Sequence, residues 1–243
     1  MKTIFNWIGA DWKRVKNHCR TTVNKEFTDK EPNKEFKKKL LISEHTPIRL
    51  IEIDWSWKGI KSWVSVHWTR HKHEKFVSTQ RDDRKEHDIS RNDMPQSTPV
   101  DMDNYANAQQ LIDIFRKRLC HQAHPETREY AVDFKRMLHK KEPELADVLV
   151  PNCVYRLGCP EFSMCKDCTF TEFLKYCKEK GYTTEQLLNI QKRYDIFNEW
   201  FYEKTRPVRE SCEECEYAHY NDHWGKIFCY YDGKGCPFKI GKD

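Results

Sequence analysis

The stretch Trp63–Arg84 most constrains how this chain can fold, because an apolar pattern runs directly into a dense cationic motif. Apolar residues alternate with polar ones just before the motif, and this period-two pattern predicts a β-strand over Ser62–Trp68, with Val64, Val66 and Trp68 on one face. Two polar groups follow at once, Arg70-His71-Lys72-His73 and Ser78-Thr79-Gln80-Arg81.

Guanidinium and hydroxyl donors fit phosphate oxygens in forked geometry, and open α/β sheets bind ligands where their strands end. The motif after Trp68 therefore predicts a site for a phosphorylated or anionic ligand. A charged turn that only faces water is the alternative, since runs of charge are usually solvated.

The composition is that of a folded protein with a highly charged surface. Of the 243 residues, 13% are aromatic, which argues against disorder, and 33% are charged. The net charge of +5 is too mild to indicate nucleic-acid binding without a clustered basic patch. The first residues lack the apolar run of a signal peptide, and no window approaches ~18 apolar residues, so we expect a cytoplasmic protein without membrane spans.

Residues before the motif predict a short series of elements. Helical pieces are expected at Phe5–Val15 and Lys34–Leu41, and a strand at Arg49–Trp55. The pair Lys58-Gly59 suggests a turn before the second strand. Residues 82–103 contain two prolines and no periodic apolar signal, so a long functional or mobile loop is expected there.

Two helices are expected after this loop. Asp103 is the candidate N-cap of the first, whose apolar stripe is Leu111, Ile114, Phe115 and Leu119. The second begins near Pro125 and is limited by Pro143, with an apolar stripe of Tyr130, Val132, Phe134 and Leu138. Further on, Thr183 and Gln186 form a capping-box pattern ahead of another helical region.

The composition changes near Val150, where we place a division between a domain of residues 1–150 and an extension of residues 151–243. The extension holds two cysteine tetrads, and each contains a Cys-x2-Cys pair that can grip a tetrahedral ion. The predicted metal ligands are Cys153, Cys159, Cys165 and Cys168 in the first tetrad, and Cys212, Cys215, Cys229 and Cys236 in the second.

Zinc is the favoured metal, and an iron–sulfur cluster is the alternative because it also takes four thiolates. His219 and His223 could replace a cysteine ligand, and buried free thiols are the structural alternative. We assign the isolated Cys19, Cys120 and Cys177 to packing.

Residues 40–150 resemble the flavin-dependent thymidylate synthase family in the order of their motifs. His45-Thr46-Pro47-Ile48 is similar to a family segment of the form His-x-Ser/Thr-Pro. Arg70-His71-Lys72 resembles the family's Arg-His-Arg motif, with lysine in place of the second arginine. Phe115–Ala131 is similar to its second signature, although Ala123-His124-Pro125-Glu126 stands where the family has Ala-Gln-Trp-Glu.

The resemblance implies an α/β (α+β) fold with a central, mainly antiparallel sheet and helices, to which this chain adds a helical metal-binding C-terminal extension. It implies FAD-dependent methylation of dUMP to dTMP, with methylenetetrahydrofolate as carbon donor and NADPH as reductant. The family's homotetramers place active sites between subunits, so we expect a homotetramer. Another pyrimidine nucleotide or another one-carbon group is an open variant, and so is an inactive paralogue.

The resemblance also implies roles for individual residues. Those expected to meet the flavin are Arg70, His71, Lys72, Arg118 and His121. Those expected to bind the nucleotide are Ser78, Thr79, Gln80, Arg81 and Arg128, of which Arg81 and Arg128 are the catalytic candidates. Glu126 is expected to orient an arginine, whereas His121 and His124 have the alternative of being simple helix-end histidines.

A zinc-dependent nucleic-acid-binding protein is the rival interpretation. In that case Arg70–Lys75 and Arg81–Arg84 would contact phosphates, and the tail would be a zinc finger. Acidic residues interrupt the basic run at Glu74, Asp82, Asp83 and Glu86. Backbone-phosphate binding disfavours such interspersed acid, so we expect neither a nucleic-acid nor a membrane partner.

Overall fold

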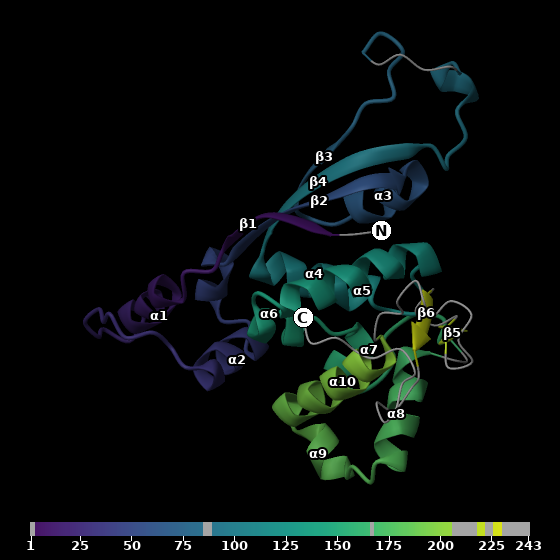
Figure 1. Cartoon of the computed structure of the whole chain (residues 1–243). Helices are drawn as coiled ribbons and strands as arrows, with labels where there is room; N and C mark the ends of the chain where they lie inside the picture. The colour runs from purple at the N-terminus through teal and green to yellow at the C-terminus, as the bar shows by residue number, and fades with distance from the viewer. Residues whose placement is uncertain (1–2, 85–88, 166–167, 206–217, 222–225, 230–243) are drawn as a thin grey trace, which may run out of the picture.

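The computed structural model describes residues 3–84, 89–165, 168–205, 218–221 and 226–229. Its main sheet has the strand order β1-β2-β4-β3, and every neighbouring pair is antiparallel (Figure 1). The strands are β1 (Ile4–Gly9), β2 (Glu52–Lys61), β3 (Glu74–Val77) and β4 (Pro99–Asn107). The expected mixed fold with a mainly antiparallel sheet is confirmed.

The sheet is apolar on one face, because its strands alternate between buried and partly exposed residues. On β2, Ile53, Trp55 and Trp57 are fully buried, whereas the neighbouring Glu52 and Asp54 keep contact with solvent. Helices α4 (Ala108–Arg118) and α5 (Pro125–His139) lie beneath this apolar face (Figure 1). The ring of Trp55 packs edge-on to Phe134 of α5 at 4.9 Å between centroids.

Residues 62–69 form helix α3 (Ser62–Thr69), so the strand predicted over Ser62–Trp68 is wrong. The sheet uses the preceding residues instead, since β2 continues to Lys61. Val64 and Trp68, which are buried, are also spaced i, i+4, and that spacing suits a helix as well as a strand. Val66, the middle residue of the alternating pattern, is 47% exposed.

Two further expectations, the turn at Lys58-Gly59 and the helix at Phe5–Val15, fail because these residues lie wholly or partly in strands. Lys58-Gly59 is no turn but part of an irregularity in the β2–β4 register between Trp57 and Ile60. Gly59 has φ +65°, which suits glycine, and its N–H donates to Asp101 Oδ1 at 3.0 Å. The predicted helix at Phe5–Val15 is also wrong in its first half, which is strand β1, and helix α1 (Trp12–Thr21) follows the N-cap Asp11.

The predictions for three helices agree with the structure. Helix α2 (Lys34–Ile42), α4 and α5 are confirmed, and the expected apolar stripes of α4 and α5 are buried. Asp103 is not an N-cap, because it lies inside β4 opposite Ser56. Asn107 caps α4 instead and forms a capping box with Gln110. Within the expected loop, the 3-10 helix η2 (Arg91–Asp93) and the start of β4 are ordered elements.

The remaining described elements are six helices and a hairpin. The helices are the 3-10 helix η1 (Thr46–Leu50), α6 (Pro143–Val148), α7 (Asn152–Arg156), α8 (Thr169–Glu179), α9 (Thr184–Leu188) and α10 (Ile190–Lys204). Strands β5 (Ala218–Asn221) and β6 (Lys226–Cys229) form the hairpin. The Thr183–Gln186 capping box is confirmed, at the start of α9. No described helix is long and apolar enough to span a membrane.

One hydrophobic core reaches from Trp12 to Phe201 and includes residues on both sides of the proposed division at residue 150. Lys135 of α5 lies inside it, fully buried. The ammonium donates to the Ala146 carbonyl of α6 at 2.6 Å and to Asn198 Oδ1 of α10 at 2.8 Å. Burial lowers the pKa of Lys135 to about 7. The division into residues 1–150 and 151–243 stays a prediction.

Candidate functional site

The cationic motif lies in a turn between helix α3 and strand β3. Arg70 and Lys72 are exposed, whereas His71 is half-buried. The turn is held from within, because Lys75 Nζ donates to the carbonyls of His71 and His73 at 2.7 and 3.1 Å. Arg70 therefore follows a helix end rather than the strand end that the sequence predicted.

A pocket of about 680 Å³ lies where this turn faces helix α4. Its walls combine cations, side-chain amides and one carboxylate, namely Arg49, Arg70, His71, Lys72, Asn107, Gln109, Gln110, Asp113 and Ile114. Cationic forks and amide N–H groups are the donors that phosphate oxygens accept. The pocket can therefore bind an anionic group of a larger ligand.

His71 and Arg118 connect the turn to the far end of α4. Arg118 Nε donates to His71 Nε2 at 2.7 Å. Burial and the charge of Arg118 lower the pKa of His71 to about 4, so the imidazole is neutral near pH 7 and can accept this hydrogen bond. Burial and the charge of Arg70 in turn lower the pKa of Arg118 to about 10. Three of the residues expected to meet a flavin thus lie in one electrostatic cluster.

The second polar group of the motif lies at the other end of β3. Ser78 pairs with Asp101 of β4, whereas β3 begins opposite Tyr105. At ~3.3 Å per residue, the two ends are about 13 Å apart. In Figure 1 the loop that follows β3 projects from the end of the sheet that is remote from α4. Within one chain, Ser78, Thr79, Gln80 and Arg81 are therefore apart from the pocket.

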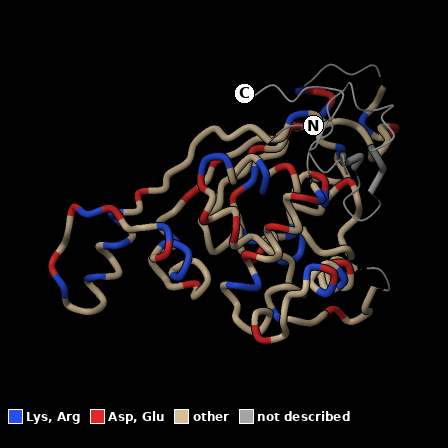
Figure 2. The backbone as a smooth tube through the Cα atoms, turned by 60° about the horizontal axis from the view of Figure 1, so that its bottom comes forward, with Lys and Arg blue, Asp and Glu red and all other residues tan. Residues whose placement is uncertain are grey.

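Arg81 is committed to a local ion pair in this loop. Its Nε and Nη2 donate to the carboxylate of Asp83 at 2.8 and 2.6 Å, and both side chains are more than half exposed. Figure 2 shows the same mixture elsewhere, with Lys and Arg interspersed among Asp and Glu along the described chain. Exposed pairs of this kind contribute little stability, ~0–1 kcal/mol, so Arg81 can exchange Asp83 for a ligand.

Arg128 and His121 lie in and beside the connection between α4 and α5. Arg128 is 1% exposed. Its Nη1 donates to the His121 carbonyl at 2.7 Å and to the Ala123 carbonyl, so the guanidinium fastens this connection. Glu126 pairs with Lys61 at 2.7 Å rather than with the arginines that the sequence suggested. The ligand roles of Arg128 and His121 stay predictions.

The sequence reasoning missed Arg49 and the amides of the pocket. Arg49 lies in η1, only two residues beyond the His45-Thr46-Pro47 segment that had already been singled out. Asn107 and Gln110 carry the capping-box spacing, which would have placed the start of α4 and one pocket wall correctly. The misleading signal was Asp103, another residue type that favours N-caps.

Part of this chain resembles a known protein family. Residues 78–144 match the family model described as thymidylate synthase complementing protein. The predicted resemblance to flavin-dependent thymidylate synthases is confirmed. No curated protein sequence matches the chain.

A solved structure shows the same fold over much of this chain. A crystal structure of thymidylate synthase X from Helicobacter pylori with FAD and dUMP superposes with a TM-score of 0.52 at 14% identity, over 61% of this chain and 99% of that one. A second crystal structure, of flavin-dependent thymidylate synthase from Helicobacter pylori complexed with FAD and dUMP, gives a TM-score of 0.49 at 15% identity, over 58% of this chain and 96% of that one. A large part of this chain therefore lies outside the shared fold.

Most of the cysteines lie beyond residue 144, where the family match ends. Those of the first tetrad are free thiols, with Cys153 and Cys168 buried and Cys159 and Cys165 half-buried. Within the described ranges, no three or more His, Cys, Asp or Glu side chains are grouped so as to hold a metal ion. Of the second tetrad, Cys229 ends β6, and Cys212, Cys215 and Cys236 lie outside the described residues. Both ligand sets stay predictions.

Proposed function

We propose that this protein catalyses the flavin-dependent methylation of dUMP to dTMP, using methylenetetrahydrofolate and NADPH. The observation that carries the proposal is the pocket between α4 and the Arg70–Lys72 turn, with Arg118 hydrogen-bonded to neutral His71. The family match at residues 78–144 and the fold shared with a thymidylate synthase X that holds FAD and dUMP support it.

The pocket suits the anionic part of FAD. Arg49, Arg70 and Lys72 supply positive charge, and Gln109 and Gln110 supply amide groups, around a space of about 680 Å³. Because His71 is neutral near pH 7, it orients Arg118 without adding to the repulsion among these cations. The flavin, when bound, supplies the electron-transfer chemistry, and the protein supplies binding and orientation.

The nucleotide half of the site is proposed to form between subunits. Arg81 and the hydroxyls of Ser78 and Thr79 would bind the dUMP phosphate, but within one chain the length of β3, about 13 Å, separates Ser78 from the strand end that follows the Arg70–Lys72 turn. In a homotetramer, the loop of one copy could serve the pocket of another. Arg128, His121 and Gln80 are kept as proposed contacts of the nucleotide or flavin, and Arg128 would also hold the connection that carries His121.

Visible absorption of the purified protein, incubated with FAD and then desalted, tests the proposal. We expect a yellow protein whose absorption is bleached by a reductant. Arg81→Ala should retain flavin and lose about tenfold to hundredfold in dUMP affinity, because a charge-assisted hydrogen bond contributes ~1.5–3 kcal/mol. Isothermal titration measures that affinity.

Arg84→Ala is the matched control, since Arg84 is exposed in the same loop and also contacts Asp83. It should bind dUMP as the unaltered protein does. A colourless protein that takes up no FAD, and binds DNA in a salt-sensitive way, would contradict the flavoenzyme and favour the nucleic-acid-binding alternative. Unchanged dUMP affinity in Arg81→Ala would remove Arg81 from the site.

A further inference from the structure

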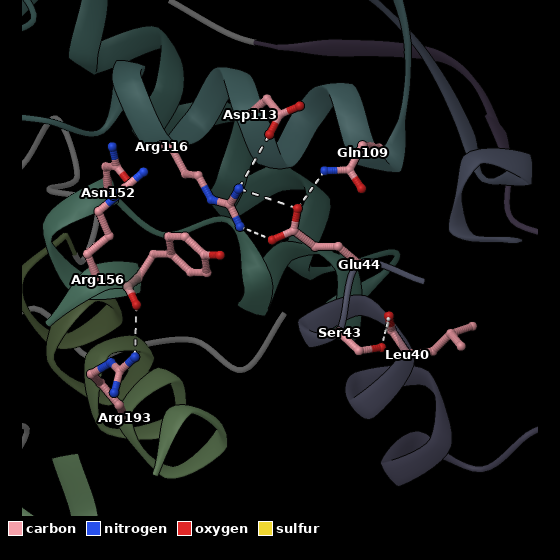
Figure 3. A network of polar contacts seen from close by, with 10 residues as sticks. Leu40, Ser43, Glu44, Gln109, Asp113, Arg116, Asn152, Arg156 and Arg193 are labelled. Carbon is pink, nitrogen blue, oxygen red and sulfur yellow. Dashed lines mark hydrogen bonds and ion pairs between the residues drawn. The ribbon is translucent and has the colours of Figure 1, made fainter. Parts of the chain in front are cut away.

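Arg116 of α4 sits at the centre of a polar network behind the pocket (Figure 3). Its two Nη groups donate to both carboxylate oxygens of Glu44, the residue that follows the C-cap Ser43 of α2. Both side chains are largely withdrawn from water, at 15% exposed for Arg116 and 22% for Glu44. Each charge therefore depends on the other for its compensation.

This pair holds two walls of the pocket. Gln109, which lines the pocket, donates through Nε2 to Glu44 Oε2 at 2.6 Å. Asp113, the carboxylate in the same lining, accepts from Arg116 Nη1 at 3.4 Å. The position of Arg116 thus sets where the Gln109 amide and the Asp113 carboxylate lie relative to the cations of the Arg70–Lys72 turn.

The aromatic ring of Tyr155 in α7 also supports the guanidinium of Arg116. Arg116 Cζ lies 3.8 Å from the centroid of the Tyr155 ring, which is a close cation–π contact. The backbone of α7 is itself anchored, because Arg193 of α10 donates to the carbonyls of Val154 and Tyr155 at 2.7 and 2.8 Å. Figure 3 shows Arg193 below α7 and Arg116 above it.

We propose that Tyr155 is a positioning residue for the pocket, and that through Arg116 and Glu44 it sets the affinity of the pocket for anionic ligands. Tyr155 lies beyond residue 144, where the family match ends. The identity of the physiological ligand, FAD, rests on the proposed function. The preference for anions rests only on the lining of the pocket.

The reason is electrostatic. Without the ring, the guanidinium of Arg116 gains water on its open face and is free to leave Glu44. An uncompensated Glu44 carboxylate then adds negative charge behind the pocket and releases Gln109. Both changes weaken the binding of an anion. A desolvated cation–π contact corresponds to about a tenfold change in an equilibrium constant.

Isothermal titration with inorganic pyrophosphate, followed by FAD, tests this on the full chain. Tyr155→Leu removes the ring and should bind pyrophosphate about tenfold more weakly. Tyr155→Phe keeps the ring and should bind as the unaltered protein does. Tyr182→Leu is the matched control, because Tyr182 also lies beyond the family match but hydrogen-bonds to Glu199 instead of contacting the network.

A double-mutant cycle separates positioning from general destabilisation. Arg116→Met alone should weaken binding, and adding Tyr155→Leu should weaken it no further, since both changes break one chain of contacts. At saturating FAD and dUMP, kcat of Tyr155→Leu should stay near that of the unaltered protein. If Tyr155→Leu does not fold, as judged by circular dichroism, Arg116→Lys takes its place, because it keeps the charge but loses the planar stack and fork.

Equal loss in Tyr155→Phe and Tyr155→Leu, equal loss in Tyr182→Leu, or unchanged affinity in Tyr155→Leu would each overturn the inference, as would an unaltered protein that binds no pyrophosphate. A protein that binds pyrophosphate with the expected variant pattern but takes up no FAD would leave the inference standing. That result would contradict the proposed function alone.

Discussion

At the scale of single residues, Lys135 shows how much a buried cation can depend on its surroundings. The ammonium lies within 5.0 Å of the Phe201 ring centroid and makes hydrogen bonds to Ala146 and Asn198. Burial lowers its pKa from 10.5 to about 7, so the folded protein holds the proton less tightly than the unfolded chain. Its contribution to stability must therefore change with pH.

We expect the stability difference between the unaltered protein and Lys135→Met to shift in favour of the unaltered protein from pH 7 to pH 9. Below pH 7 the lysine is charged in both states and the fold bears the full cost of burying the charge. Between pH 7 and 10.5 only the unfolded chain binds the proton, so stability rises with pH, by at most about 4–5 kcal/mol in total. Urea unfolding at both pH values measures this.

Lys140→Met is the control, because Lys140 is exposed at the end of the same helix. The difference in unfolding free energy between Lys140→Met and the unaltered protein should be the same at pH 7 and pH 9. A pH-independent difference for Lys135→Met would mean that the buried lysine is solvated or paired more strongly than its contacts indicate.

At the scale of elements, residues 62–69 explain why part of the fold escaped sequence reasoning. Val64, Val66 and Trp68 fit a strand by alternation, but the sheet already has its strand in β2, which passes through the irregularity at Gly59 and ends at Lys61. Local pattern cannot reveal how far a neighbouring strand extends. Helices α4 and α5 were predictable, because their apolar stripes run for several turns.

The start of α4 offers a test of the capping assignment. We expect Asn107→Ala to lower the free energy of unfolding by about 1 kcal/mol, because it removes the side-chain acceptor for the Gln110 N–H. Asp103→Ala should cost less than about 0.5 kcal/mol, as expected for a surface change away from a cap. Chemical denaturation of both variants measures the difference, and a larger loss for Asp103→Ala would contradict the assignment of Asn107.

At the scale of the whole molecule, the candidate site joins segments that are far apart in the sequence. The sequence analysis expected Arg70–Lys72 and Arg118 at one site by resemblance to family motifs, and the structure brings His71 and Arg118 into contact. The distance of Arg81 from the pocket was not predictable, because the motif order says nothing about which end of β3 faces α4. Nor could sequence reveal the contact of Tyr155 with Arg116, which joins segments separated by both α5 and α6.

Metal binding by the cysteines can be tested on the intact protein. If the second tetrad holds zinc, purified protein should contain metal, and Cys215→Ser should lower the content by about one ion per chain. Prolonged chelation should then lower the melting temperature, because structural metal contributes folding free energy. Elemental analysis and thermal melting measure both effects.

Cys19→Ser is the matched control, since Cys19 lies on α1 and belongs to neither tetrad. This substitution should leave the metal content unchanged. If the purified protein is brown and contains iron, the tetrad holds an iron–sulfur cluster instead of zinc. A metal-free protein that melts at an unchanged temperature would contradict a structural metal altogether.

The pairing of Lys38 with Asp195 joins segments that are synthesised far apart in time. During translation, α2 and α5 leave the ribosome long before α10, whose Phe197 and Phe201 complete the same core. At ~5–20 residues per second, the apolar sides of the early helices stay uncovered for several seconds. A nascent chain of this protein should therefore depend on chaperones until α10 emerges.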